Sequence, residues 1–180
     1  MVTKILRTLL SEDGSEAIEM ACLMPLILLI LAFTFDRFII YEGTTAIAYS
    51  GNEAIRSTVI QSSEEEAAQR GLEILSDRLG ASHMGWCDGP DLEACTSWDD
   101  GAVITSSVDS FKSNPQIRYA FATDKGWCNG SYVTLSVRAH KASLMPSYST
   151  LRKLLTEGGP VYHEYTYTVH ARVETNKPCK

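Results

Sequence analysis

The chain has 180 residues, which is enough for one ordinary domain with an anchor segment and too few for two full domains. Its formal net charge is −6, and its 16 Lys and Arg residues form no long run, which argues against nucleic acid as a partner. The mean hydropathy of −0.07 averages an apolar N-terminal stretch with a polar remainder.

The apolar stretch from Met20 to Tyr41 is the first predicted element. It carries no charged residue before Asp36. As an α-helix it would be about 33 Å long, close to the thickness of the hydrocarbon core of a bilayer. Lys4 and Arg7 precede it, so the positive-inside rule places the N-terminus in the cytoplasm and the rest of the chain outside.

Three kinds of membrane-targeting segment fit this stretch. A cleaved secretory signal peptide would end at the small-x-small match Ala46-Ile47-Ala48, but charged residues at 36, 37 and 42 separate that site from the apolar run. An uncleaved single-pass anchor is the simplest alternative. The third is a prepilin signal, cut before the apolar helix so that the helix stays on the mature protein.

Glu19 distinguishes the third alternative from the other two. A carboxylate at membrane depth costs roughly 2.5–3.5 kcal/mol on insertion scales, and is therefore a functional-site hypothesis. The other interpretation is an interfacial carboxylate whose side chain extends to water. Gly14 lies five residues before Glu19, and its lack of a Cβ lets an extended backbone lie close to a membrane protease.

Residues 7–42 resemble the start of type IV pilin-like proteins, most closely the TadE-like minor pilins of tight-adherence (Tad/Flp) systems. The matching features are a short basic leader, a glycine before the cut, an acid five residues after it, a proline in a Leu/Ile-rich helix and an acid–base pair near its end: Lys4, Arg7, Gly14, Glu19, Pro25, Asp36 and Arg37. Two features depart from the family pattern. Met20 stands where an aromatic is common, and Glu12-Asp13 where a basic residue often precedes the glycine.

The resemblance implies that a prepilin peptidase cuts between Gly14 and Ser15 on the cytoplasmic face and removes residues 1–14. It also implies that Glu19 meets the new N-terminal amine of a neighbouring subunit. The expected partners are the inner (cytoplasmic) membrane, the prepilin peptidase, other pilin and minor pilin subunits, and the proteins of the assembly platform.

Beyond the membrane, the N-terminal helix is expected to continue to residue 62, so that residues 15–62 form one helix that spans the membrane over about 20–41. Gly43 and Gly51 each weaken this helix by ~1 kcal/mol relative to alanine. Its second half is expected to pack on the head through a face that repeats at helical spacing. That face consists of Ala46, Tyr49, Glu53, Arg56 and Ile60.

The head, residues 63–180, is predicted to open with a second helix. Ser63 and Glu66 form a capping-box pattern, and Gly80 is expected to stop the helix after Leu79. The expected buried face is Ala68, Leu72, Leu75 and Leu79.

The rest of the head is predicted to be a small sheet. Residues 81–101 are expected to form a loop, and alternating apolar residues predict strands at 117–122, 132–140 and 164–173, with a weaker one at 103–110. Each strand should have one buried and one wet face, and residues 149–157 should form a short helix. The predicted fold class is α+β: a long N-terminal membrane-spanning helix packed on a small antiparallel β-sheet, as in pilins.

Four cysteines follow the apolar stretch, an even number that suits an oxidising compartment. If the strands near 132 and 173 pair antiparallel, Cys128 and Cys179 lie close together, and Cys87 and Cys95 close the loop between them. We prefer these two pairs. Two similar Gly-Trp-Cys segments, at 85–87 and 126–128, favour Cys87 with Cys128 as the alternative. Cys22, within the apolar stretch, is expected to be a small buried hydrophobic residue.

No metal, cofactor or catalytic motif is predicted, and the protein is expected not to be an enzyme. The four histidines are interpreted as surface residues: His83, His140, His163 and His170. The predicted function is a minor pilin or pseudopilin subunit of a tight-adherence type IV pilus or a related secretion system. The alternative is a single-pass membrane-anchored extracytoplasmic binding or sensor module, and a membrane-anchored envelope enzyme is a third possibility. In either of the first two, the C-terminal part lies outside the cell membrane, in the periplasm or the medium.

Overall fold

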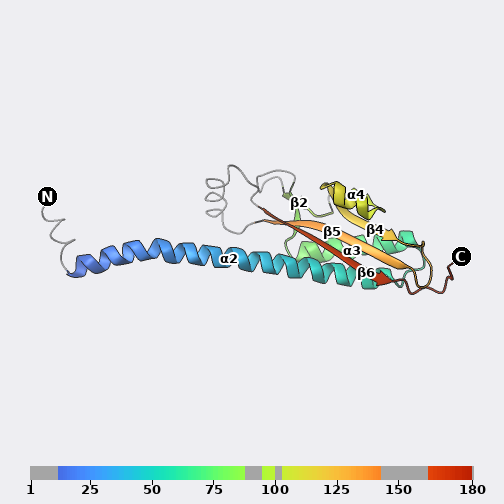
Figure 1. Ribbon diagram of the computed structural model, residues 1–180, viewed down its shortest axis with the longest axis horizontal. Coiled ribbons are helices and arrows are strands. Elements are labelled where there is room, and N and C mark those ends of the chain that lie inside the picture. The colour runs from blue at the N-terminus through green and yellow to red at the C-terminus, as the bar shows by residue number, and fades with distance from the viewer. Residues whose placement is uncertain (1–11, 88–94, 100–102, 143–161, 180) are drawn as a thin grey trace. The chain divides into compact units, whose positions relative to one another are not determined.

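The computed structural model describes residues 12–87, 95–99, 103–142 and 162–179. The chain divides into two compact units, Met1–Ile39 and Ile40–Lys180. The elements in chain order are α2 (Glu12–Thr58), α3 (Glu64–Ala81), β1 (Gly85–Cys87), β2 (Cys95–Ser97), β3 (Val103–Thr105), α4 (Val108–Ser113), β4 (Ile117–Thr123), β5 (Tyr132–Ala142) and β6 (Tyr162–Arg172) (Figure 1). The short helix predicted at 149–157 lies outside the described residues.

Helix α2 is 47 residues long, or about 70 Å, and belongs to both units. It starts at Glu12, before the predicted first residue Ser15, and ends at Thr58, before the predicted residue 62. The helix passes through Pro25 and through both glycines, Gly43 and Gly51.

The face that α2 buries in the second unit is not the predicted one. Tyr49 and Ile60 are 63% and 65% exposed, whereas Ile47, Ala54 and Ile55 are buried. The cause is the pair of glycines, Gly43 and Gly51, against which tyrosine rings of β6 pack closely. The buried stripe therefore contains the two glycines together with Ile47, Ala54 and Ile55.

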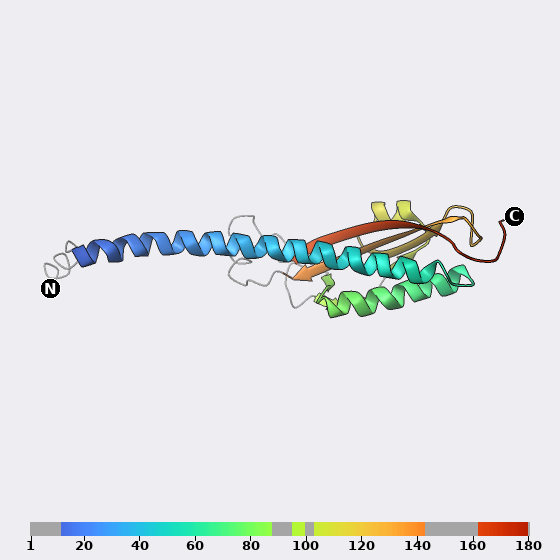
Figure 2. The same cartoon turned by 90° about the horizontal axis from the view of Figure 1, so that it is seen from below.

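Helix α3 lies alongside the second half of α2 (Figure 2). Its predicted cap is present, since the Ser63 hydroxyl accepts a hydrogen bond from the Glu66 backbone N–H at 3.3 Å. The predicted stop is wrong: Gly80 lies inside the helix, and the left-handed residue that follows is His83, with φ of 54°. The buried face is shifted by one residue from the prediction and consists of Ala67, Gly71, Leu75 and Leu79.

In the described part of the chain, six strands form one sheet in the order β2-β1-β5-β4-β3, with β6 paired to β5. β4, β5 and β6 are antiparallel, and the β5–β6 ladder extends from Tyr132 opposite Arg172 to Ala142 opposite Tyr162. β3 is instead parallel to β4, because the short helix α4 carries the chain back to the starting end of the sheet. The strand predicted at 103–110 therefore ends at Thr105.

The segment 81–101, predicted as a loop, contains the antiparallel pair β1 and β2. These strands are three residues each, too short to show an alternating pattern. The pairing places Cys87 directly opposite Cys95.

One face of β5 is the centre of the core, as predicted: Val133, Leu135, Val137 and Ala139 are fully buried. The other face was expected to be wet, and this is wrong for Ser136, Arg138 and His140, which are 0%, 7% and 4% exposed. The same expectation is wrong for β4, where Arg118 and Ala120 are buried. Phe111 of α4 lies under the Arg138 guanidinium, and Trp86 of β1 stacks on His140. The outward residues of β6 are exposed, as predicted.

Candidate functional site

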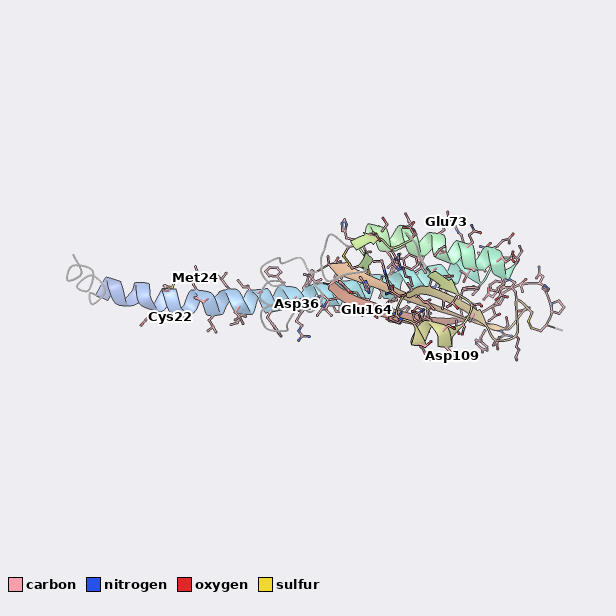
Figure 3. The ribbon with its side chains drawn as sticks, turned by 90° about the horizontal axis from the view of Figure 1, so that it is seen from above. Cys22, Met24, Asp36, Glu73, Asp109 and Glu164 are labelled. Atoms are coloured by element: carbon pink, nitrogen blue, oxygen red, sulfur yellow. A yellow bond between two sulfur atoms is a disulfide. The ribbon has the colours of Figure 1, made fainter. Side chains whose placement is uncertain are left out.

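In the described residues, the first unit is a single, largely apolar helix in which Asp36 is buried. Its Leu, Ile, Met and Phe side chains from 20 to 38 are exposed, and Cys22 and Met24 project from it (Figure 3). Cys22 is therefore not buried within the chain itself. The part of α2 that begins at Glu19 is long and apolar enough to cross a membrane, judged by length and composition.

The predicted processing residues lie at the start of this helix. Gly14 and Ser15 belong to the first turn of α2, where backbone N–H groups have no acceptor within the helix. Glu19 lies just beyond that turn, and its side chain is exposed at the beginning of the uncharged run. The basic leader residues Lys4 and Arg7 lie outside the described residues.

The second unit contains two disulfides, which are the two pairs preferred from the sequence. Cys87–Cys95 joins β1 to β2. Cys128–Cys179 joins the turn before β5 to the tail after β6, across a sequence separation of 51 residues. Two disulfides in one small unit indicate an oxidising, extracytoplasmic environment for that unit.

Backbone hydrogen bonds hold the same tail in place. The Glu174 N–H donates to the Val59 carbonyl at 3.0 Å, and the Asn129 N–H donates to the Lys177 carbonyl at 2.7 Å. Gly130, with φ of 89°, turns the chain so that its N–H donates to the Val173 carbonyl at 3.1 Å. The C-terminal tail is thus fixed to the turn before β5 and to Val59, the residue that follows α2.

Three tyrosines pack against three helical glycines and join the helices to the sheet. Their pairs are Tyr165 with Gly43, Tyr167 with Gly51, and Tyr119 with Gly71. The Tyr119 hydroxyl donates to the Ala68 carbonyl at 3.1 Å, and burial raises the pKa of the Tyr119 phenol well above its usual value. Glycine spacing in α2 and α3 was a usable sign of these contacts, but the sequence analysis treated Gly43 and Gly51 only as helix weaknesses.

The buried cationic side chains on the other face of β5 stabilise the fold. Arg138 donates to three backbone carbonyls, those of Phe111, Asn114 and Ile117, and pairs with Glu164 at 3.1 Å. These bonds use a guanidinium fork to hold α4 and the turn before β4 against β5. Alternation in the sequence could not reveal them, because a long charged side chain at an outward position usually indicates solvent.

The buried side chains of Lys141 and Arg118 also have partners within the second unit. The Lys141 ammonium lies 2.8 Å from the Glu42 carboxylate, and Arg118 donates to the Trp98 carbonyl at 2.9 Å. Arg118 also lies over the Trp86 ring.

The hollows formed by the described residues of the second unit are open to solvent. One of about 600 Å³ lies between the start of α3 and β4, with Ala68, Phe121, Trp127 and Lys177 in its lining. Within the described ranges, no three His, Cys, Asp or Glu side chains gather closely enough to hold a metal ion.

No protein-family model, curated protein or solved structure matches the chain significantly. Its function is therefore inferred from its residues and their geometry.

Proposed function

We propose that this protein is a TadE-like minor pilin or pseudopilin subunit of a tight-adherence pilus or a related secretion system. The observation that carries the proposal is the start of α2: Gly14-Ser15, then Glu19, then an exposed uncharged helix that leads into a disulfide-bonded α+β unit. A simple anchor needs the apolar helix but has no need of a carboxylate at its beginning.

Processing would occur at the Gly14–Ser15 bond on the cytoplasmic face. A membrane-embedded peptidase must bind this bond in an extended form, so the first turn of α2 has to open. That turn is the part of a helix that opens most easily, since its N–H groups make no bonds within the helix. Glycine at position 14 then lets the enzyme approach the backbone without a side chain in the way.

Glu19 would act after processing. The new amine at Ser15 of one subunit and the Glu19 carboxylate of its neighbour form an ion pair that offsets the cost of each charge in a low-dielectric environment. Because only one axial position brings these groups together, the pair selects one register of assembly. The apolar helix would hold the subunit in the membrane, with its second unit outside, until the subunit enters a filament.

The proposal is tested by determining the N-terminus of the full chain, made with and without an active prepilin peptidase. We expect mature protein that begins at Ser15, and we expect Gly14→Ala to abolish the cut. Gly80→Ala is the matched control, because nothing lies within 4 Å of the Cβ position of that glycine, which belongs to the second unit. An intact N-terminus in the presence of active peptidase would overturn the proposal and leave a single-pass anchored module.

A further inference from the structure

The two residues of the Cys128–Cys179 disulfide differ in their access to solvent. Cys128 is 5% exposed, whereas Cys179 is an exposed residue of the C-terminal tail. A thiolate breaks a disulfide by attacking one sulfur and expelling the other, and access is one of the factors that decide which sulfur it attacks. We therefore expect an incoming thiolate to attack Cys179 and to expel Cys128.

The other disulfide of the second unit is less open to the same attack. Cys87 is 4% exposed, and Cys95 is partly buried. The residues between them include Asp88, Asp91 and Glu93 and no Lys or Arg. Because a thiolate is an anion, these acidic residues disfavour its approach, and the Cys87–Cys95 bond should exchange more slowly.

The segments around Cys128 and Cys179 carry the opposite charge balance. Residues 124–131 and 172–179 contain three cationic and two acidic side chains: Lys125, Arg172 and Lys177 against Asp124 and Glu174. Both lysines are exposed, and the Arg172 guanidinium lies beside Gly130, with its Nη2 2.9 Å from the position of a Cβ built there. Positive charge attracts an anionic thiol and stabilises a cysteine thiolate, so an anionic thiol is the favoured reagent.

We propose that Cys179 is a site of thiol exchange for a small anionic thiol of the glutathione class. The thiolate sulfur bonds to the Cys179 Sγ, the Cys128–Cys179 bond breaks, and its electron pair leaves with Cys128, which takes a proton from water. The incoming thiol is oxidised to a mixed disulfide while Cys128 is reduced, so the step needs no further oxidant or reductant. It concerns the second unit alone and does not rest on the pilus proposal.

The exchange releases the end of the C-terminal tail. After β6 the tail passes the end of α2 (Figure 2), where the Glu174 N–H donates to the Val59 carbonyl. Further along, the Asn129 N–H donates to the Lys177 carbonyl, two residues before the disulfide. The disulfide keeps the two chain segments of this bond together. Once it is broken, the bond opens more often, as backbone bonds near a free chain end do.

The attacked sulfur is identified by incubating the full chain, in a Cys22→Ala background, with reduced glutathione. Exchange is stopped with acid, free thiols are blocked with a maleimide under denaturing conditions, and peptides are mapped by mass spectrometry. We expect glutathione on Cys179 and maleimide on Cys128 at least tenfold more often than the reverse, and more often than any adduct on Cys87 or Cys95. Glutathione mainly on Cys128, faster exchange at Cys87–Cys95, or no adduct on Cys179 would overturn the proposal.

Two single-thiol variants test access without competition from ring closure. In the same background, Cys128→Ala leaves the Cys179 thiol free and Cys179→Ala leaves the Cys128 thiol free, while both keep the other disulfide. We expect the Cys179 thiol to react with oxidised glutathione at least tenfold faster than the Cys128 thiol. Equal rates would contradict the assignment of Cys179 as the exposed partner.

The preference for an anionic thiol is tested by removing two positive charges. In the disulfide-intact chain, Lys125→Gln/Lys177→Gln should lower the rate of exchange with glutathione at least threefold at low salt and leave the rate with uncharged 2-mercaptoethanol unchanged. Lys112→Gln, at an exposed position of α4, is the control and should change neither rate. An equal loss with both thiols would overturn the charge preference.

Release of the tail is measured by amide hydrogen exchange. The Cys128→Ala chain with glutathione on Cys179 cannot re-form the native bond and is compared with the disulfide-intact chain. We expect the Asn129 amide to exchange at least fivefold faster in the modified chain. The Val173 amide, which donates to the Ser131 carbonyl beside the β5–β6 ladder, should be unchanged. Equal protection of Asn129 in the two chains would overturn the release of the tail.

Discussion

Three glycines in the two long helices leave space against which tyrosine side chains of the sheet pack. A Cβ built at Gly43 would lie 2.7 Å from two atoms of the Tyr165 side chain, and one at Gly51 would lie 2.7 Å from the Tyr167 ring. The helix thus loses some intrinsic stability at each glycine but lets the sheet approach closely. The packing of these rings against the glycines explains why the buried face of α2 differs from the face predicted from helical spacing.

Gly43→Ala should destabilise the second unit although alanine is the better helix former. The added methyl displaces the Tyr165 ring, and overpacking of this kind costs about 1–3 kcal/mol. Gly80→Ala is the matched control, since nothing lies within 4 Å of its Cβ position. That variant should be neutral or stabilising by up to about 1 kcal/mol. Thermal unfolding followed by circular dichroism measures both, and equal melting temperatures would contradict the packing role of Gly43.

Tyr119 should make stability fall at alkaline pH. Burial raises the pKa of this phenol in the folded state, so above about pH 10 the unfolded chain loses a proton that the folded chain keeps. The folded state then loses about 1.4 kcal/mol of stability per pH unit until the folded pKa is reached. Urea unfolding measured between pH 9 and 11 should show this slope in the native chain only above about pH 10.

Tyr119→Phe should flatten that slope and, near neutral pH, cost about 1 kcal/mol for the lost bond to the Ala68 carbonyl. Tyr49→Phe is the control, because Tyr49 is exposed and its removal should leave the alkaline slope intact. Identical slopes in the native and Tyr119→Phe proteins would show that another group governs the alkaline limb.

At the scale of elements, the disulfides contribute unequally. In the chain-entropy model a cross-link stabilises more when it closes a longer loop. Cys128–Cys179, with a separation of 51 residues, should contribute about 4 kcal/mol, and Cys87–Cys95, with a separation of 8, about 2–3 kcal/mol. Cys128→Ala/Cys179→Ala should therefore lower the midpoint of urea unfolding more than Cys87→Ala/Cys95→Ala, and the reverse order would contradict this ranking.

Elements with a strong pattern could be predicted from the sequence, and those set by contacts far along the chain could not. The strands β4, β5 and β6 follow from alternating apolar residues, and the start of α3 follows from Ser63 and Glu66. The antiparallel β5–β6 ladder also made the Cys128–Cys179 pair foreseeable. β1 and β2 are too short for a pattern, and β3 is parallel to β4 only because α4 intervenes.

The burial of Arg138, on the face of β5 that was expected to be wet, could not be predicted for the same reason. Arg138 occupies an outward position, and its sequence neighbourhood predicts solvent there. Its burial depends on Phe111, 27 residues away in sequence, and on carbonyl acceptors supplied by a turn. Only the assembled fold brings these groups together, so local sequence could not predict them.

For the molecule as a whole, a substitution at Glu19 should distinguish processing from assembly. Under the proposed function, Glu19→Ala should still be cut between Gly14 and Ser15 but should enter filaments poorly, because the neighbouring amine loses its partner. Filament fractions sheared from cells and probed for the protein give the measurement. Glu53→Ala, an acid-to-alanine change in the second unit, is the control. Unchanged incorporation of Glu19→Ala would refute the docking role.

The Asn129-Gly130 turn is a sequence at which asparagine deamidation is favoured. Deamidation of an asparagine requires the next backbone nitrogen to attack the side-chain amide, and a following glycine offers the least hindrance. Here the Gly130 nitrogen donates to the Val173 carbonyl, and the Asn129 nitrogen donates to the Lys177 carbonyl, so the folded tail restrains the attacking atom. We therefore expect deamidation at Asn129 to be slow while the C-terminal tail is bound to this turn and faster in molecules whose tail has detached.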